Sequence, residues 1–312
     1  MRSIQQTAPR LALSCLAFAC MSGGLLAAPE FRWEESETSL ALLNGERVVW
    51  RHIHDAKQSK PCFHPLSTLD GTVLTELRPA DHRWHLATWF SWKFINGLNY
   101  WEENPKTGLS AGLTEIGAVT VKKGADFSAV IEFRISYNPP GKAPLLEELR
   151  TLRVGAPDAA GNYVIDWKSE FTAQEAGDLG RTPLPGEEGG KAYGGYAGLS
   201  VRVSKALRHW SYRDSEGREN GSHGKAARWL EFAGKLPDGG EAGISMFDHP
   251  SNPGYPTKWY ENRGMPYFSP ALLFDKGMSL AKGEKLSLSY RILVQSRRGD
   301  LSPWLPAFES AE

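Results

Sequence analysis

Apolar and polar residues alternate along parts of this chain with the two-residue period of a β-strand. In the segment 127–136, apolar side chains at the odd positions alternate with mostly polar side chains at the even positions. The segment 286–292 repeats the pattern, with Leu, Leu, Tyr and Ile at its even positions. Because successive side chains of a strand point to opposite faces of its sheet, each segment predicts a strand with one buried face.

Less regular apolar runs predict further strands at residues 119–121, 145–154, 163–172, 199–203, 229–232 and 242–247. The dipeptide Asn44-Gly45 predicts a tight hairpin, because both residues adopt positive φ at low steric cost. Helical periodicity is scarce, so the crossover helices that a parallel sheet requires are not expected. The pattern favours an all-β protein, a large and mainly antiparallel β-sandwich with long loops. We expect residues 29–312 to form a single extended domain, with the Gly- and Pro-rich segment 176–195 as a surface loop.

The first 28 residues have the layout of a secretory signal peptide. Arg2 and Arg10 precede an apolar run of small residues that ends near Ala28. This pattern predicts a periplasmic or secreted protein, and Cys20, in a weak match to a lipoprotein site, gives lipid anchoring as an alternative. No later segment is long and apolar enough to span a bilayer, so we expect no integral membrane domain.

The balance of charges argues against a nucleic-acid partner, and the cysteine content argues against an intramolecular disulfide. The 312 residues include 36 Lys and Arg and 36 Asp and Glu, so the chain has no net positive field for nucleic acid, and no nucleic-acid partner is expected. Cys62 is the one cysteine after the predicted signal peptide and has no partner for an intramolecular disulfide. The sequence does not indicate an oligomeric state.

Two segments combine histidine with aspartate, and they give the best clue to chemistry. One runs from Arg78 to His85 and the other from Asp248 to Asn252. Imidazole and carboxylate groups exchange protons near neutral pH or ligate metals. The candidate catalytic residues are His64, Asp81, His82, His85, Asp248 and His249. Their spacing matches no short metal motif, so metal and cofactor are unassigned. This hypothesis requires that folding brings the two segments to one concave surface.

Aromatic and paired charged residues are candidates for substrate binding. Glu148 and Arg150 have the same parity on a predicted strand, so they could share a polar cleft, with an exposed ion pair as the alternative. Trp84 and Trp259 neighbour the two histidine segments and could stack on sugar rings, with core packing as the alternative. The full set is Arg78, Trp84, Glu148, Arg150, Asn252 and Trp259.

Several motifs together resemble a bacterial family of unknown function labelled PmoA-like or "methane oxygenase PmoA". The matching segments are 60–66, 78–85, 148–151, 248–250 and 283–291. The resemblance implies a β-rich exported protein, of a kind commonly associated with bacterial sugar degradation, and it implies no established catalytic residues. An integral methane monooxygenase subunit needs membrane-spanning helices, which are not expected in this chain after residue 28.

Three functional hypotheses follow. The leading one is an exported carbohydrate-active enzyme that uses His and Asp for general acid-base chemistry on a glycan or modified sugar, in cleavage, elimination or isomerisation. The second is a noncatalytic carbohydrate-binding protein of the cell envelope, in which the same residues form a recognition cleft. The third is a metal-dependent oxidoreductase.

Overall fold

The computed structural model describes residues 29–305 and 308, so the predicted signal peptide lies outside the described residues. Its regular structure consists of strands, with one short 3-10 helix at Ser302–Trp304. Sheet 1 has, in spatial order, β1 (Phe31–Ser36), β2 (Ser39–Asn44), β3 (Arg47–Ile53), β4 (Cys62–Leu66), β5 (Thr88–Ser91), β13 (Gly198–Arg202), β18 (Tyr267–Pro270) and β17 (Trp259–Asn262).

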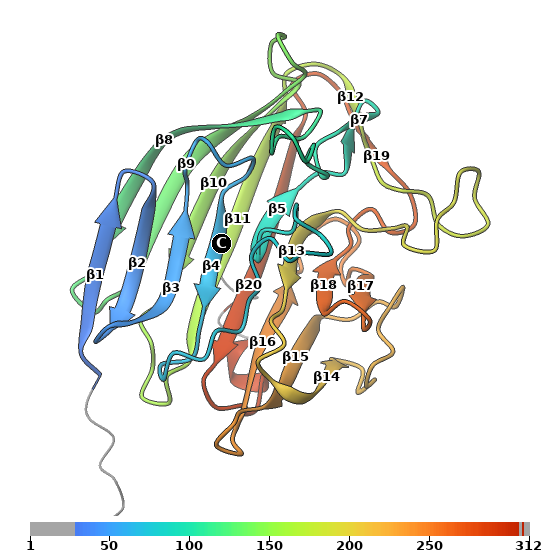
Figure 1. Ribbon diagram of the computed structural model, residues 1–312. Helices are drawn as coiled ribbons and strands as arrows, with labels where there is room; N and C mark the ends of the chain where they lie inside the picture. Colours follow the sequence, from blue (N-terminus) through green and yellow to red (C-terminus); the bar gives the residue numbers. More distant parts are fainter. Residues whose placement is uncertain (1–28, 306–307, 309–312) are drawn as a thin grey trace, which may run out of the picture.

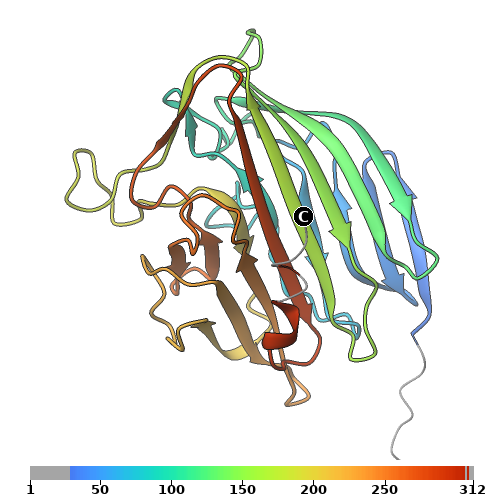
Figure 2. The same ribbon diagram turned by 180° about the vertical axis from the view of Figure 1, so that it is seen from behind.

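A second large sheet packs against the first (Figure 1). Sheet 2 contains, in spatial order, β14 (Arg208–Asp214), β15 (Trp229–Lys235), β16 (Glu241–Asp248), β20 (Lys285–Gln295), β11 (Tyr163–Ala173), β10 (Leu146–Val154), β9 (Ala129–Asn138) and β8 (Leu113–Lys123). A smaller sheet contains β19 (Met278–Leu280), β12 (Gly177–Gly180), β6 (Phe94–Ile95) and β7 (Leu98–Asn99). Figure 2 shows the long strands of sheet 2 from behind.

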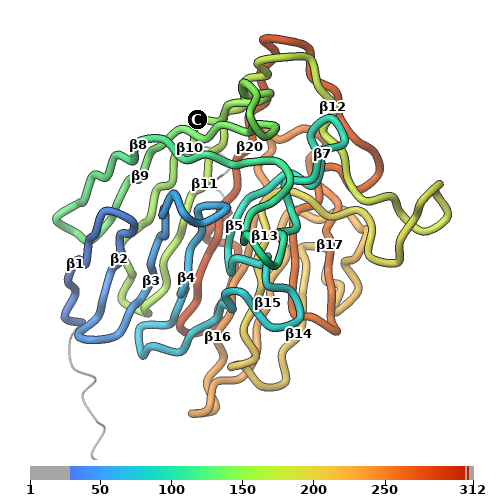
Figure 3. Tube along the Cα trace, turned by 45° about the horizontal axis from the view of Figure 1, so that its top comes forward, coloured from blue at the N-terminus to red at the C-terminus, as the bar shows by residue number. Residues whose placement is uncertain are grey.

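Every pairing between these strands is antiparallel, which confirms the predicted fold class. The tube in Figure 3 shows β1 to β4 lying across from β8 to β11, as two layers of a sandwich. The Asn44-Gly45 hairpin is also confirmed, because Gly45 adopts φ +58° between β2 and β3. The strand expected from residue 127 begins later, at Ala129, because Phe127 adopts φ +68°, which is incompatible with a strand.

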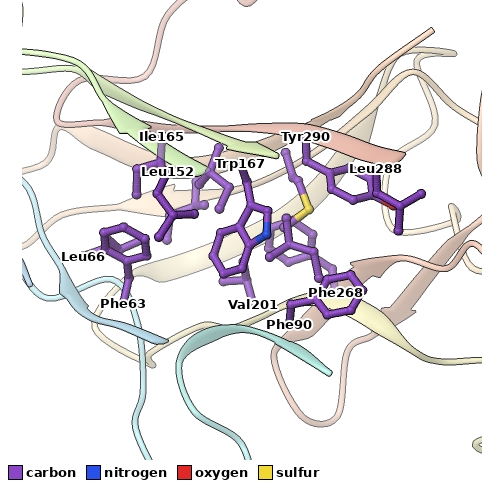
Figure 4. Close-up of a cluster of buried hydrophobic side chains, with 14 of the residues drawn as sticks. Phe63, Leu66, Phe90, Leu152, Ile165, Trp167, Val201, Phe268, Leu288 and Tyr290 are labelled. Atoms are coloured by element: carbon purple, nitrogen blue, oxygen red, sulfur yellow. The ribbon is translucent and has the colours of Figure 1, made fainter. Parts of the chain in front are cut away.

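The main core lies between the two large sheets. Phe63 and Phe90 of sheet 1 and Trp167 and Tyr290 of sheet 2 are almost completely buried in one apolar cluster (Figure 4). Because side chains alternate across a strand, the neighbours of these residues point out of the sandwich. The outer face of each sheet therefore carries its own smaller cluster, and these two clusters determine where the candidate site lies.

The outer face of sheet 1 carries the larger of these clusters. We call it outer cluster 1, and its buried members are Cys62, Leu86, Trp89, Trp101, Tyr196, Tyr260, Tyr267, Ala271 and Phe274. Cys62 is a free cysteine, and burial raises the pKa of its thiol to about 12. The outer face of sheet 2 carries outer cluster 2, with buried members Phe247, Leu293, Leu301 and Phe308.

Candidate functional site

A cavity of about 430 Å³ opens over outer cluster 1. We call it the aromatic pocket, and it is lined by His82, Trp84, His85, Trp101, Glu102, Tyr193, Tyr196, Tyr260, Asn262, Met265 and Tyr267. Six of these eleven residues are aromatic, so flat apolar walls surround a few polar groups. Both the volume and this mixture are typical of a site for a small organic ligand.

The pocket is assembled from segments that are far apart in the sequence. Tyr260 and Asn262 come from β17, and Tyr267 comes from β18, at the edge of sheet 1. The loop before β5 contributes His82, Trp84 and His85. The loop after β7 contributes residues 101–102, and the loop before β13 contributes Tyr193 and Tyr196. The pocket is therefore a product of long-range strand pairing.

His82 is linked to a buried arginine through Asp81. The distance from His82 Nδ1 to Asp81 Oδ2 is 3.0 Å, and Arg202 Nη2 donates to both oxygens of Asp81 at 3.0 Å. Arg202 is buried on β13, whereas the His82 side chain is 35% exposed. The carboxylate holds the proton of a neutral imidazole on Nδ1, which leaves the lone pair of Nε2 for a ligand.

Asp81 is suited to this role because it stays ionised. Partial desolvation raises the pKa of its carboxyl group, but the hydrogen bonds from His82 and Arg202 outweigh that effect and lower the pKa below the ordinary value. A permanent negative charge beside His82 stabilises the imidazolium that forms when the ring takes up a proton.

The buried ring of His85 packs against the ring of His82. Its ring stacks on the ring of His82, and it also packs against Trp89 and Tyr267. Burial, with smaller contributions from the positive charges of His82 and Arg202, lowers the pKa of His85 to about 2. His85 is therefore neutral at working pH, and its buried Nδ1 has no hydrogen-bond partner among the described residues.

Glu102 is a pocket residue that the sequence analysis missed. Its carboxylate forms an ion pair with the buried Lys93 and accepts hydrogen bonds from Tyr196 Oη at 3.0 Å and Asn99 Nδ2 at 2.6 Å. Desolvation raises the pKa of Glu102, but the charge of Lys93 and the hydrogen bonds from Lys93, Asn99 and Tyr196 together outweigh it, so the pKa lies below the ordinary value. No motif marks Glu102, although the aromatic-rich segment 89–101 that precedes it could have directed attention to it.

Of the predicted residues in the first histidine segment, Trp84 lines the pocket and Arg78 does not. Arg78 forms an ion pair with Glu103 and donates to the carbonyl of Arg83 at 3.1 Å. Its backbone nitrogen donates to the carbonyl of His85 at 2.8 Å. Arg78 therefore closes the loop that presents His82 and Trp84.

His64 lies on β4, outside the residues that line the aromatic pocket. Its Nδ1 lies 3.1 Å from Thr75 Oγ1, and burial lowers the pKa of its ring to about 4. These contacts support a neutral structural histidine.

The second histidine segment does not reach the pocket. Asp248 is buried at the end of β16, where Oδ1 accepts from Asn252 Nδ2 at 2.7 Å and Oδ2 accepts from Thr257 N at 2.8 Å. Asn252 also exchanges hydrogen bonds with the backbone of Ser289, at 2.7 and 2.8 Å. Asp248 and Asn252 therefore fasten the loop after β16 to β20.

His249 lies beside outer cluster 2. Its Nδ1 is 2.7 Å from Ser251 Oγ, and its Nε2 is 3.1 Å from the carbonyl oxygen of Phe308. The expectation that the two histidine segments meet on one concave surface is wrong. The first segment packs over the outer face of sheet 1, whereas β16 belongs to sheet 2 and its loop packs against the outer face of that sheet.

Trp259 is a core residue. Its side chain is fully buried between the sheets, and its Nε1 donates to the carbonyl of Ala227 at 2.8 Å. The expected sugar-stacking role of Trp259 is wrong, because alternation along β17 points its neighbour Tyr260 into the pocket instead.

Glu148 and Arg150 do share one face of β10, as their parity predicted, but that face is the core. Arg150 Nε donates to Glu148 Oε1 at 2.7 Å, and neither side chain is exposed. Tyr137 and Ser169 donate to the same carboxylate at 2.5 and 2.6 Å, and the Arg150 guanidinium lies 4.7 Å from the centre of the Trp167 ring. The two alternatives expected for Glu148 and Arg150, a shared polar cleft and an exposed ion pair, are therefore both wrong.

The model of DUF6807, a family of unknown function, matches residues 39–302. The protein belongs to the DUF6807 family. No curated protein matches this DUF6807 chain. The comparison does not test the PmoA-like resemblance, which stays a prediction.

Two solved structures are similar to this DUF6807 protein at low identity. The α-galactosidase from Lactobacillus brevis has 10% identity and a TM-score of 0.42, over 88% of this chain and 40% of that enzyme. The Slr1438 protein from Synechocystis sp. PCC 6803 has 10% identity and a TM-score of 0.31, over 86% of this chain and 97% of that one. The chain thus spans less than half of the galactosidase.

Two further features bear on the alternatives. Within residues 29–305 and 308, no three or more His, Cys, Asp or Glu side chains are grouped so that they could hold a metal ion. The same residues contain no helix of the length and apolarity needed to cross a membrane.

Proposed function

We propose that this protein is an exported carbohydrate-active enzyme that transfers a proton on a sugar, in an elimination or an isomerisation, with His82 as the general base. The observation that carries this proposal is that His82, which lines the aromatic pocket, is hydrogen-bonded to Asp81. Export to the periplasm or beyond is part of the proposal and rests on the sequence of residues 1–28.

The pocket walls suit a sugar ring. Trp84, which is only partly buried, offers a flat face on which the C–H groups of a pyranose can stack. Asn262 and the phenol groups of Tyr193 and Tyr260 offer donors and acceptors for hydroxyl groups. This combination of apolar faces and directional polar groups supports a carbohydrate as the ligand.

His82 can transfer the proton with the help of two neighbouring residues, Asp81 and His85. Nε2 accepts a proton from an O–H group of the sugar or from a carbon next to a carbonyl group, which takes up the electron pair, and Asp81 stabilises the resulting imidazolium. The same proton then returns to a neighbouring carbon or oxygen in an isomerisation, or passes to the leaving group in an elimination. His85 remains neutral throughout and holds the plane of the His82 ring.

Hydrolysis by a pair of carboxylates has less support. Glycosidases of that kind use one carboxyl group as an acid and a second as a base or nucleophile. Among the residues that line the pocket, Glu102 is the one carboxylate, and Lys93 engages both of its oxygens. Proton transfer by His82 is therefore the reaction class that the geometry supports best.

The test is hydrogen exchange in D2O. The protein is incubated with a panel of neutral glycosides and of their oxidised, carbonyl-containing forms, and NMR records deuterium at carbon and any new unsaturated product. We expect exchange or product with at least one sugar, and its loss in His82→Gln. The matched control is His209→Asn, because His209 is exposed on β14 and Asn tolerates its φ of +47°.

A noncatalytic sugar-binding protein is the second candidate, and the aromatic lining of the pocket favours it. Saturable binding with no exchange and no product across the whole panel would replace the enzyme proposal with this one. Absence of both binding and conversion would remove a carbohydrate function altogether.

A further inference from the structure

A second concavity adjoins the aromatic pocket and shares a wall with it. Its volume is about 460 Å³, and it is lined by Asn99, Glu102, Glu103, Asn104, Thr107, Leu109, Ser110, Ala111, Leu113 and Pro140. We call it the polar depression. Glu102 lines both spaces, so the two concavities meet at this residue.

Hydrogen bonds and an ion pair hold Glu102, the residue shared by the two concavities, in one position. Lys93 and Asn99 bond to the carboxylate of Glu102 from one side, and Tyr196 Oη donates to it from the side of the aromatic pocket. Asn99 Oδ1 also accepts from the backbone nitrogens of Trp101 and Glu102, at 2.8 and 3.2 Å. A ligand that crosses this wall therefore meets a fixed carboxylate edge.

The far side of the depression is a preformed turn. Asn104 N donates to the carbonyl of Leu109 at 2.8 Å, and Gly108 N donates back to the carbonyl of Asn104 at 2.8 Å. Gly108 adopts φ +69°, which a residue with a side chain rarely does. This turn presents the Leu109 side chain, which is 41% exposed, beside the hydroxyl of Thr107 and the amide of Asn104.

The chemistry of the depression repeats that of a sugar subsite. An exposed apolar side chain stands among amide and hydroxyl groups, which match the C–H faces and hydroxyl edges of a pyranose. The lining includes no lysine or arginine. At Glu102, the side chain is 30% exposed whereas its partner Lys93 is 5% exposed, so a ligand meets the carboxylate oxygens before the ammonium group. An acidic sugar would therefore be repelled.

We propose that the polar depression is a second sugar subsite, so that the substrate is an uncharged glycoside of at least two units, with one ring in the aromatic pocket and the next over Leu109. This inference rests on the proposed function of the aromatic pocket. It adds the length and the charge of the substrate, which that proposal leaves open.

The test compares three forms of each sugar on the full chain by titration calorimetry. The forms are the methyl monoglycoside, a disaccharide that carries the same terminal unit, and the same disaccharide oxidised to a uronic acid. We expect the neutral disaccharide to bind about tenfold more tightly than the monoglycoside, through stacking and hydrogen bonds in the second subsite. We expect the uronic acid form to bind more weakly than the neutral disaccharide.

Two variants test whether the gain in affinity for the disaccharide arises in the polar depression. Leu109→Ser and Thr107→Val should each reduce the ratio of disaccharide to monoglycoside affinity toward one. Trp84→Ala should weaken both ligands and preserve the ratio. Lys282→Ser, at an exposed ion pair with Glu175 outside both linings, serves as the control.

The outcomes separate the two proposals. Binding of monoglycosides with no gain for any disaccharide, or a gain that Leu109→Ser leaves intact, overturns the second subsite and retains the function of the aromatic pocket. Tighter binding of the uronic acid overturns the inferred charge of the substrate. Failure of every sugar to bind overturns both proposals together.

Discussion

The imidazole rings of His82 and His85 stack with their centroids 4.7 Å apart and their planes inclined by 29°. His85 is buried, and its pKa of about 2 keeps it neutral, whereas the partly exposed His82 is bonded to Asp81. Two charged rings in such contact would repel each other, so the neutrality of His85 allows His82 to take up a proton. The pair therefore consists of one reacting ring and one supporting ring.

Replacement of His82 by glutamine should reduce turnover about 10²- to 10⁴-fold, because a general base is removed. The side chain is 35% exposed, so the free energy of unfolding should change little. Steady-state kinetics and urea unfolding check both parts. Full activity in His82→Gln would exclude this residue as the base, and His209→Asn controls for the loss of a histidine.

Replacement of Trp84 and of Trp259 by alanine should have opposite consequences. Trp84 lines the pocket, so Trp84→Ala should weaken sugar affinity about tenfold with little loss of stability. Trp259 is fully buried in the core, so Trp259→Ala should lower the free energy of unfolding by about 3–5 kcal/mol. Calorimetry measures the first effect and urea denaturation the second. Equal losses of stability in both variants would contradict the assigned positions.

The buried ion pair of Glu148 and Arg150 gives a test of the core. Arg150→Met alone should destabilise the fold by about 3–5 kcal/mol, because it leaves a buried carboxylate without its cation. The double variant Glu148→Leu, Arg150→Met should lose less than the single variant, because both buried charges are gone. Urea unfolding at neutral pH measures both. A double variant that is less stable than Arg150→Met would contradict this account.

Ionisation of the buried Asp248 carboxyl group should make the free energy of unfolding depend on pH. Burial raises the pKa of its carboxyl group to about 6, despite the opposing hydrogen bonds from Asn252 and Thr257. Because the folded pKa is above the unfolded value, the stability from this group is fully present below pH 4 and is lost as pH rises through about 6. The loss is roughly 3 kcal/mol at 1.36 kcal/mol per pKa unit.

Unfolding curves from pH 4 to 7 measure this dependence, with Asp248→Asn as the matched variant. The variant should lack the part of the slope that Asp248 contributes, because an amide does not titrate in this range. Identical slopes in the two proteins would show that Asp248 ionises normally in the fold.

The alternation of apolar and polar residues along the sequence predicted the fold class correctly. The alternation over 127–136 and 286–292 corresponds to β9 and β20, and the Asn44-Gly45 turn lies where the hairpin was expected. The short strands β6 and β7 were not predicted, because two residues are too few to show a period. The expectation that 176–195 is entirely a loop is wrong at its start, because Gly177–Gly180 forms β12 between β19 and β6. The single-domain organisation, the signal peptide and the PmoA-like resemblance stay predictions.

The candidate site was predicted in part. Asp81, His82, Trp84 and His85 are close in sequence, so their proximity is a local property that a motif can show. Glu102, Tyr196 and Tyr260 come from separate loops and strands, and no local pattern relates them to the first group.

The sequence by itself determined the fold class, the longer strands, which residues share a face of those strands, and that Asp81 stands beside His82. Tertiary structure decided which of those faces are buried and which strands are neighbours. The reason is that a two-residue period assigns a side chain to one of two faces, whereas the partner of each face depends on pairing between distant segments. For that reason Glu148 and Arg150 lie in the core, His249 lies over sheet 2, and the aromatic pocket forms over sheet 1.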